Sequence, residues 1–143
     1  MDRELSSRLV ASLGAVRAIN ADYIATSQAT GSTSYTDLAT VGPTVTLITG
    51  TDAIIDFGCL YFDDGNLGND GMMSVAVSGA TTIAASDTWY AFGSQGVNVE
   101  PTSNGYKFTN LNPGSNTFTA KFKKSGGTST ASFQNRWLIV TAL

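Results

Sequence analysis

The sequence predicts a mainly β protein: an antiparallel β-sandwich, jelly-roll-like, with a short N-terminal helix. The composition supports this class, because 19 Thr and 15 Gly favour pleated strands joined by tight turns. Short apolar runs also alternate with turn signals at intervals of about ten residues. A chain of 143 residues is the length of one domain with its own core, and we see neither an internal repeat nor a second domain.

The first 24 residues carry the pattern of a helix. Apolar residues recur there at steps of four and three and would share one helix face; they are Leu5, Leu9, Leu13, Val16, Ile19 and Tyr23. A strict heptad would pass through Ser12 instead of Leu13, so the match to a coiled coil is imperfect. A helix this short, with Gly14 inside it, is marginal alone. We therefore expect residues 1–24 to serve assembly or anchoring, with the six apolar residues as the interface.

Three surfaces could bury this stripe: the protein's own β domain, copies of the same helix, or a groove on a neighbouring protein. Residues 25–34, ATSQATGSTS, contain no charge and no apolar side chain larger than Ala. This composition is typical of a linker. It favours a helix that projects from a β domain spanning residues 35–143.

The β domain is predicted from its strands and turns in order. Strand patterns cover VTLIT (45–49), AIIDFGCLYF (53–62), MSVAVSG (73–79), TWYAFG (88–93), NTFTAKFKK (116–124) and SFQNRWLIVTAL (132–143). Gly58 indicates a bulge, and Asn104-Gly105 a tight turn between VNVE and YKFTNL. Alternation places Met73, Val75 and Val77 on one face, and likewise Phe118, Ala120 and Phe122. Seven to nine strands are expected.

The residue types needed for catalysis are missing. The chain has no histidine, which excludes Ser-His-Asp and Cys-His arrangements, and it has no phosphate-binding or dinucleotide motif. We expect a protein that is not an enzyme and needs no cofactor. The single Cys59 cannot form an internal disulfide and is expected to be an inert core thiol. Trp89 is the aromatic residue to test for glycan binding if it faces solvent; core packing is the alternative.

One loop could hold a cation. FDDGNLGNDG, residues 62–71, offers hard oxygen ligands suited to calcium; they are Asp63, Asp64, Asn66, Asn69 and Asp70. The spacing departs from the EF-hand pattern, and the same residues suit the Asx turns of a hairpin loop. We therefore predict no metal site.

Charge is distributed unevenly along the chain. Residues 25–106 hold eight acidic residues and no Lys or Arg, whereas residues 107–143 hold five basic residues and no acidic one. Either strands from the two halves pair and their charges become neighbours, or an acidic face of one subunit meets a basic face of another. The net charge of −3 argues against nucleic acid as a partner.

The sequence also argues against a membrane protein. No apolar stretch is long enough to span a bilayer. Asp2, Glu4 and Arg17 are unlike a signal peptide, so we expect synthesis and assembly in a cytoplasm.

Three segments, SYTDLATVGPTVT, VSGATT and LNPGSNTFTAKF, resemble a β domain that recurs in virion proteins of tailed bacteriophages. The resemblance covers roughly residues 34–143. Such domains occur in capsid decoration or head-fibre-type proteins and in minor tail proteins. The resemblance implies a virion structural protein that forms homo-oligomers, often trimers.

The compact layout favours a decoration protein, which would bind the major capsid protein on the capsid surface after assembly in the host cytoplasm. The alternative is a minor tail or fibre module that binds a host-surface glycan or receptor.

Overall fold

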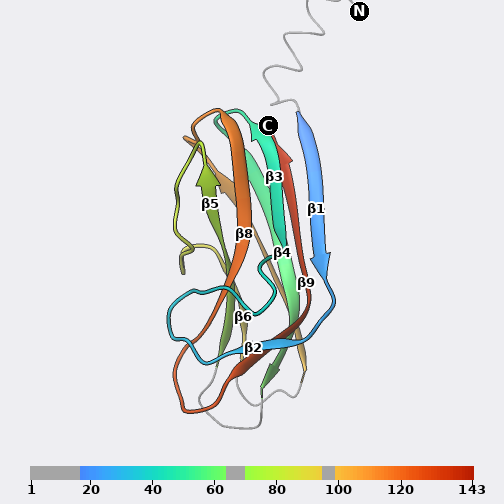
Figure 1. The fold of residues 1–143 in the computed structure, drawn as a ribbon, viewed down its shortest axis with the longest axis vertical. Helices are drawn as coiled ribbons and strands as arrows, with labels where there is room; N and C mark the ends of the chain where they lie inside the picture. Colours follow the sequence, from blue (N-terminus) through green and yellow to red (C-terminus); the bar gives the residue numbers. More distant parts are fainter. Residues whose placement is uncertain (1–16, 64–69, 95–98) are drawn as a thin grey trace, which may run out of the picture.

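A computed structural model, which describes residues 17–63, 70–94 and 99–143, shows two antiparallel sheets packed face to face (Figure 1). Sheet A has the strand order β1-β9-β4-β7, with β2 also paired to β9, and sheet B has the order β3-β8-β5-β6. The strands are β1 (Ala18–Ile24), β2 (Gln28–Thr30), β3 (Thr44–Thr49), β4 (Ala53–Asp63), β5 (Gly71–Gly79), β6 (Tyr90–Gly93), β7 (Glu100–Phe108), β8 (Gly114–Lys124) and β9 (Ala131–Ala142).

The strand pairing is that of a jelly roll. Leaving aside the short β2, four antiparallel pairs are nested in the sequence: β1 with β9, β3 with β8, β4 with β7, and β5 with β6. Rolling up this long ribbon brings β9 beside β4 and β8 beside β5, which yields two four-stranded sheets. The predicted fold class is confirmed.

The core lies between the two sheets and follows the predicted alternation. Met73, Val75 and Val77 of β5 are buried, as are Phe118, Ala120 and Phe122 of β8. From sheet A, β4 contributes every second residue from Ala53 to Tyr61. Burying each large side chain contributes about 1.5–3 kcal/mol, so this interior accounts for the sandwich without a metal or a disulfide.

The predicted N-terminal helix is wrong over residues 18–23, and Leu5, Leu9, Leu13 and Val16 lie outside the described residues. Residues 18–24 form β1, which pairs with β9 from Ala18↔Ala142 to Ile24↔Arg136. The long apolar β9 needs a neighbour at this edge, and that tertiary pairing overrides local periodicity. Ile19 and Tyr23 are four residues apart, a spacing that shares a side in a strand as well as in a helix.

Two further predictions need correction. The linker assigned to residues 25–34 contains β2, which pairs with β9 and includes the buried Thr30. Asn104-Gly105 is not a turn, because it lies inside β7, opposite Asp56 and Phe57. There Asn104 Nδ2 donates a hydrogen bond to the Tyr90 carbonyl oxygen of β6 at 2.8 Å, so this side chain joins sheet A to sheet B.

The bulge predicted at Gly58 is present, and its extra residue lies on the partner strand. The register between β4 and β9 shifts between Gly58 and Leu60, which leaves Asn135 and Arg136 opposite Cys59. Asn135 has φ of 50°, a left-handed conformation that asparagine tolerates better than most residues. The shift changes which residues of β9 face inward, and it turns Arg136 into the core.

Both ends of the described chain lie at one end of the sandwich (Figure 1). The Arg17 N–H donates a hydrogen bond to the Ala142 carbonyl oxygen at 2.8 Å. Residues 1–16 are therefore joined to the domain at this end. Within the described ranges, no helix has the length and apolar character needed to cross a bilayer.

Candidate binding site

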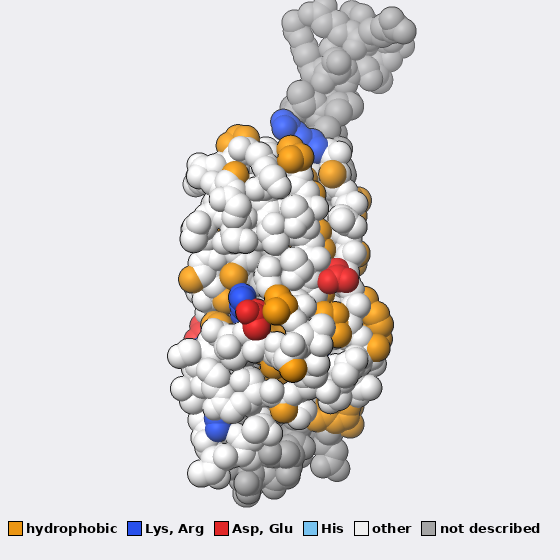
Figure 2. Space-filling model, viewed as in Figure 1, with side chains coloured by type: hydrophobic (Ala, Val, Ile, Leu, Met, Phe, Trp, Pro, Cys, Tyr) orange, Lys and Arg blue, Asp and Glu red, His pale blue; other side chains and the backbone are white. Residues whose placement is uncertain are grey.

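The outer face of sheet A carries exposed apolar side chains on two neighbouring strands, β1 and β9. On β1, Ile19 is 62% exposed and Tyr23 is 58% exposed, and on β9 Ile139 is also exposed. The side of the molecule with β3 and β8 in front is mostly white in Figure 2, the colour of backbone and of uncharged polar side chains, although Ile48 of β3 is exposed there. There Thr46 and Thr117 pair through their hydroxyls at 2.8 Å. The apolar face is the one to examine for binding.

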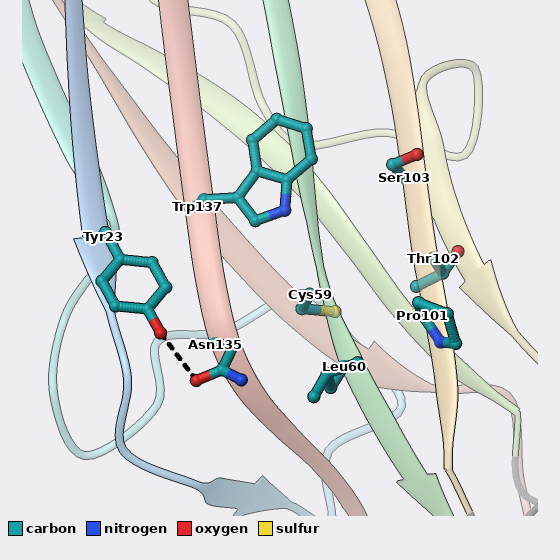
Figure 3. A pocket seen from close by; sticks show the side chains of 8 residues that line it. All are labelled: Tyr23, Cys59, Leu60, Pro101, Thr102, Ser103, Asn135 and Trp137. Atoms are coloured by element: carbon teal, nitrogen blue, oxygen red, sulfur yellow. Dashed lines mark hydrogen bonds between the residues drawn. The ribbon is translucent and has the colours of Figure 1, made fainter.

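A hollow of about 390 Å³ lies on this face across all four main strands of sheet A (Figure 3). It is lined by Tyr23, Cys59, Leu60, Pro101, Thr102, Ser103, Asn135 and Trp137. None of these side chains carries a charge at neutral pH. A second hollow of about 350 Å³ shares Tyr23 and Trp137 and continues along the face toward Ile139.

The Trp137 indole forms an open aromatic surface beside the hollow. It extends from β9 over β4, where a Cβ at Gly58 would lie 2.8 Å from the indole Cζ2 and 2.5 Å from the Thr102 carbonyl oxygen. Only glycine leaves room for the ring at this position. In Figure 3 the broad face of the indole is turned toward the viewer, above the strands.

Tyr23 and Asn135 form the polar side of the hollow. The Tyr23 hydroxyl donates a hydrogen bond to Asn135 Oδ1 at 2.7 Å, which orients the amide. Neither Asn135 Nδ2 nor Trp137 Nε1 has a hydrogen-bond partner among the described residues. Figure 3 shows both nitrogens on the side of the hollow. The site thus combines a flat aromatic surface with two N–H donors.

The hollow contains no group suited to acid–base or nucleophilic chemistry. Burial raises the pKa of the Cys59 thiol to about 12, although the Arg136 charge opposes this shift. The thiol is therefore protonated at neutral pH and a poor nucleophile, as expected for an inert core cysteine. Among the described residues, no group of three His, Cys, Asp or Glu side chains is arranged to hold a metal ion.

Of the six predicted interface residues, the structure describes only Ile19 and Tyr23. Both lie on the outer face of sheet A, and Tyr23 lines the hollow. Trp137 was not singled out from the sequence, because WLIVTAL has the continuous apolar character of a buried strand. The one available signal was Gly58, whose missing side chain admits the indole.

Trp89 packs against the core, which was the alternative to a solvent-facing side chain that binds a glycan. Its Nε1 donates to the Val75 carbonyl oxygen at 2.9 Å, and its ring packs on Tyr106 and Phe108 with centroid distances of 4.7 and 5.1 Å. It is therefore not available as a binding platform.

The loop that could hold a cation is described only in part, because its residues 64–69 lie outside the described residues.

The acidic and basic halves of the chain meet within one subunit. Lys107 pairs with Asp52 at 3.2 Å, Lys121 with Asp37 at 2.6 Å, and Lys123 with Asp87 at 2.9 Å. Each pair joins a residue before position 107 to one from 107 onward. This confirms the interpretation in which the folded halves neutralise each other.

Comparisons with known proteins give little beyond this geometry. No family model and no curated protein matches the chain. A chain from a structure of infectious bursal disease virus, Gt strain, is 15% identical in sequence, with a TM-score of 0.47; the match covers 90% of this protein and 33% of the viral chain. Eiger TNF from S. frugiperda is 8% identical in sequence, with a TM-score of 0.37; the match covers 85% of this protein and 93% of the Eiger chain. This protein thus spans about a third of the viral chain.

Proposed function

We propose that the protein is a virion structural component that decorates the outer shell of a capsid as a homo-oligomer, most simply a trimer. The position of Arg17 is the observation that carries this proposal. It places the attachment point of residues 1–16 at one end of the sandwich, which is where an anchor formed by that segment would begin. The jelly roll is a scaffold of viral capsid and lectin domains among others, and the resemblance to tailed-phage virion domains favours the former.

The anchoring end carries apolar surface that fits this role. Ile19, at the start of β1, lies two residues after Arg17 and is 62% exposed. The other residues of the predicted stripe, Leu5, Leu9, Leu13 and Val16, precede it in the sequence. Burial of this stripe against other copies and against the major capsid protein would supply the contact. Because many copies bind one shell, a modest interface gives high avidity. No catalytic step and no cofactor is part of this function.

The test uses the full-length chain with the stripe made polar. We would replace Leu5, Leu9, Leu13 and Val16 by Ser, and compare this variant with a control in which the off-stripe Ser6 and Ser7 become Ala. Light scattering should give about 45 kDa for a trimer of the wild type and the control, against 14.9 kDa for the stripe variant. Co-sedimentation with empty shells of the major capsid protein should show the same split. A stripe variant that stays trimeric and binds shells like the control rules this mechanism out.

The second candidate is a module of a tail or fibre that binds a host-surface glycan or receptor, and the aromatic hollow on sheet A favours it. Location in the particle separates the two candidates. Electron microscopy of virions carrying a labelled copy would place it on the head for a decoration protein. Label confined to the tail would support the tail module and reject decoration.

A further inference from the structure

We propose that the hollow beside Trp137 is a binding site for a neutral saccharide. In this site a pyranose ring lies on the outer face of the indole. Asn135 Nδ2 donates a hydrogen bond to a hydroxyl of that ring, and Trp137 Nε1, at the indole edge, donates to a hydroxyl or acetamido oxygen deeper in the hollow. The proposal rests on the geometry of sheet A and does not depend on the virion role.

The two aromatic side chains are held in place before any ligand arrives. Trp137 lies over the bare backbone of Gly58, and Tyr23 is tied to Asn135 by a 2.7 Å hydrogen bond. A preorganised site loses less side-chain entropy on binding. The C–H groups on one face of a pyranose are weakly positive, and the face of an aromatic ring is negative. The flat, partly exposed indole of Trp137 therefore attracts a sugar ring.

The polar groups and the size of the hollow narrow the ligand class. Its lining holds no charged side chain, so nothing in it compensates the desolvation of an anion or a cation. Two unpartnered N–H donors call for ligand oxygens that accept hydrogen bonds. A volume of about 390 Å³, with a further hollow adjoining, is at the lower end of the range for small-molecule sites. A short neutral oligosaccharide meets all three conditions.

Two other occupants fit the structure less well. A peptide cannot add as a strand across the floor of the hollow, because β9 and β4 are each paired on both sides; it could add only outside the hollow, at the edge strands β1 and β7. A second copy of the chain covering this face would bury Asp56. That carboxylate is exposed on the same face of β4, two residues from Gly58, and has no partner among the described residues. Desolvating it unpaired is costly, whereas a sugar confined to the hollow leaves it in water.

The experiment screens the full-length protein against immobilised neutral oligosaccharides of hexoses and N-acetylhexosamines. Any saccharide bound is then titrated in solution, by calorimetry and by NMR of the indole N–H groups. The protein has two Trp residues, so Trp89, which is hydrogen-bonded inside the molecule, is an internal control. We expect the Trp137 signal to shift and the Trp89 signal to stay.

Three variants and one control locate the site. Trp137→Ala should weaken binding about tenfold or more, because it removes both the stacking surface and a donor. Trp137→Phe keeps a ring without the donor. Asn135→Gly removes the other donor and suits the φ of 50° at this position. Each should weaken binding about threefold to tenfold. Phe92→Ala removes an exposed aromatic side chain from β6, outside the hollow, and should bind like the wild type.

Several results would overturn the proposal. The screen could find no bound saccharide. A bound saccharide could shift only the NMR signal of the Trp89 indole N–H, or bind wild type and all variants with equal affinity. Self-association that Trp137→Ala abolishes, without saccharide binding, would assign the face to a second copy instead. If Trp137→Ala fails to fold, Trp137→Phe and Asn135→Gly decide the matter. The stripe variant described above should keep its saccharide affinity, which separates this proposal from the decoration role.

Discussion

Arg136 offers the sharpest test of how this sandwich is held together. Its side chain is 0% exposed, yet no salt bridge to it is found among the described residues. One terminal nitrogen, Nη1, donates to the carbonyl oxygens of Thr40 and Gly42, both at 3.3 Å, and Nη2 donates to Gln28 Oε1 at 2.9 Å. The guanidinium also lies 5.4 Å from the centre of the Phe122 ring. Burial lowers the pKa of this group, with the Cys59 thiol opposing the shift.

Replacing Arg136 by Met removes the buried charge and keeps much of the volume. The variant gains stability because it no longer has to bury a charge, and for this reason apolar replacements of buried ions are tolerated in some proteins. The cost is one fully buried acceptor, the Gly42 carbonyl, and a partly buried one, the Thr40 carbonyl. An unsatisfied buried acceptor costs about 1–3 kcal/mol, so we expect a net loss of about 2–4 kcal/mol. For 143 residues the unfolding entropy is roughly 0.3 kcal/mol/K, so Tm should fall by about 7–13 °C.

Arg136→Lys should be at least as damaging as Arg136→Met, although it preserves the charge. A lysine ammonium cannot reproduce the planar fork that reaches three acceptors on two segments, and a poorly paired buried charge costs about 3–5 kcal/mol. Thermal and urea unfolding at pH 7, followed by circular dichroism, measures both variants. Lys107→Met, at a cation with 52% side-chain exposure, is the control and should change stability by less than about 1 kcal/mol. A lysine variant as stable as the wild type would refute this reasoning.

Three further predictions concern other buried or paired groups. The pKa of Cys59, raised to about 12 by burial, predicts no reaction with a disulfide reagent at pH 8 until guanidinium unfolds the protein; rapid stoichiometric labelling of the native state would contradict this. Asn116→Ala should destabilise the fold by about 2–4 kcal/mol in urea titrations, because the buried amide accepts from the Thr81 N–H and donates to Thr49 Oγ1 and the Asn112 carbonyl oxygen. Ser115→Ala is the control; Asn110→Ala is unsuitable because Asn110 has φ of 60°. Hydrogen bonds from Lys123 and then Tyr35 lower the pKa of Asp87, so its carboxylate stabilises the fold above its unfolded pKa of about 4, and this stability is lost as pH falls through the lower folded pKa. The unfolding free energies of wild type and Asp87→Asn should differ by no more than about 1 kcal/mol at pH 7 and converge in acid. A difference that grows in acid would contradict this prediction.

The β architecture could be predicted from local pattern because each strand carries its own alternation. Met73, Val75 and Val77 of β5 and Phe118, Ala120 and Phe122 of β8 are buried at alternate positions, as predicted. Asn112-Pro113-Gly114 likewise leads from β7 into β8, and Gly126-Gly127 lies between β8 and β9. These signals are local, since they depend on side-chain period and on the backbone freedom of a few residues.

The errors arose where long-range pairing decided the conformation. Asn104-Gly105 has the composition of a tight turn, but β7 must pair with β4 along its length, and this keeps the dipeptide extended. Residues 18–23 have helical spacing, but the edge of β9 holds them as a strand. The candidate site depends on the same kind of contact. Tyr23 and Asn135 are 112 positions apart, and only the sheet brings them within 2.7 Å.

The sequence by itself determined that this protein is a sandwich of short strands with a polar exterior, without histidine chemistry and with an inert cysteine. Those properties follow from residue types and from periods of two residues. The tertiary structure alone decided that Trp137 lies over Gly58 beside a hollow, that Trp89 packs against the core, and that an arginine lies buried among carbonyl oxygens. The physical reason is the bulge opposite Cys59, where one extra residue in β9 reverses which side chains face the core.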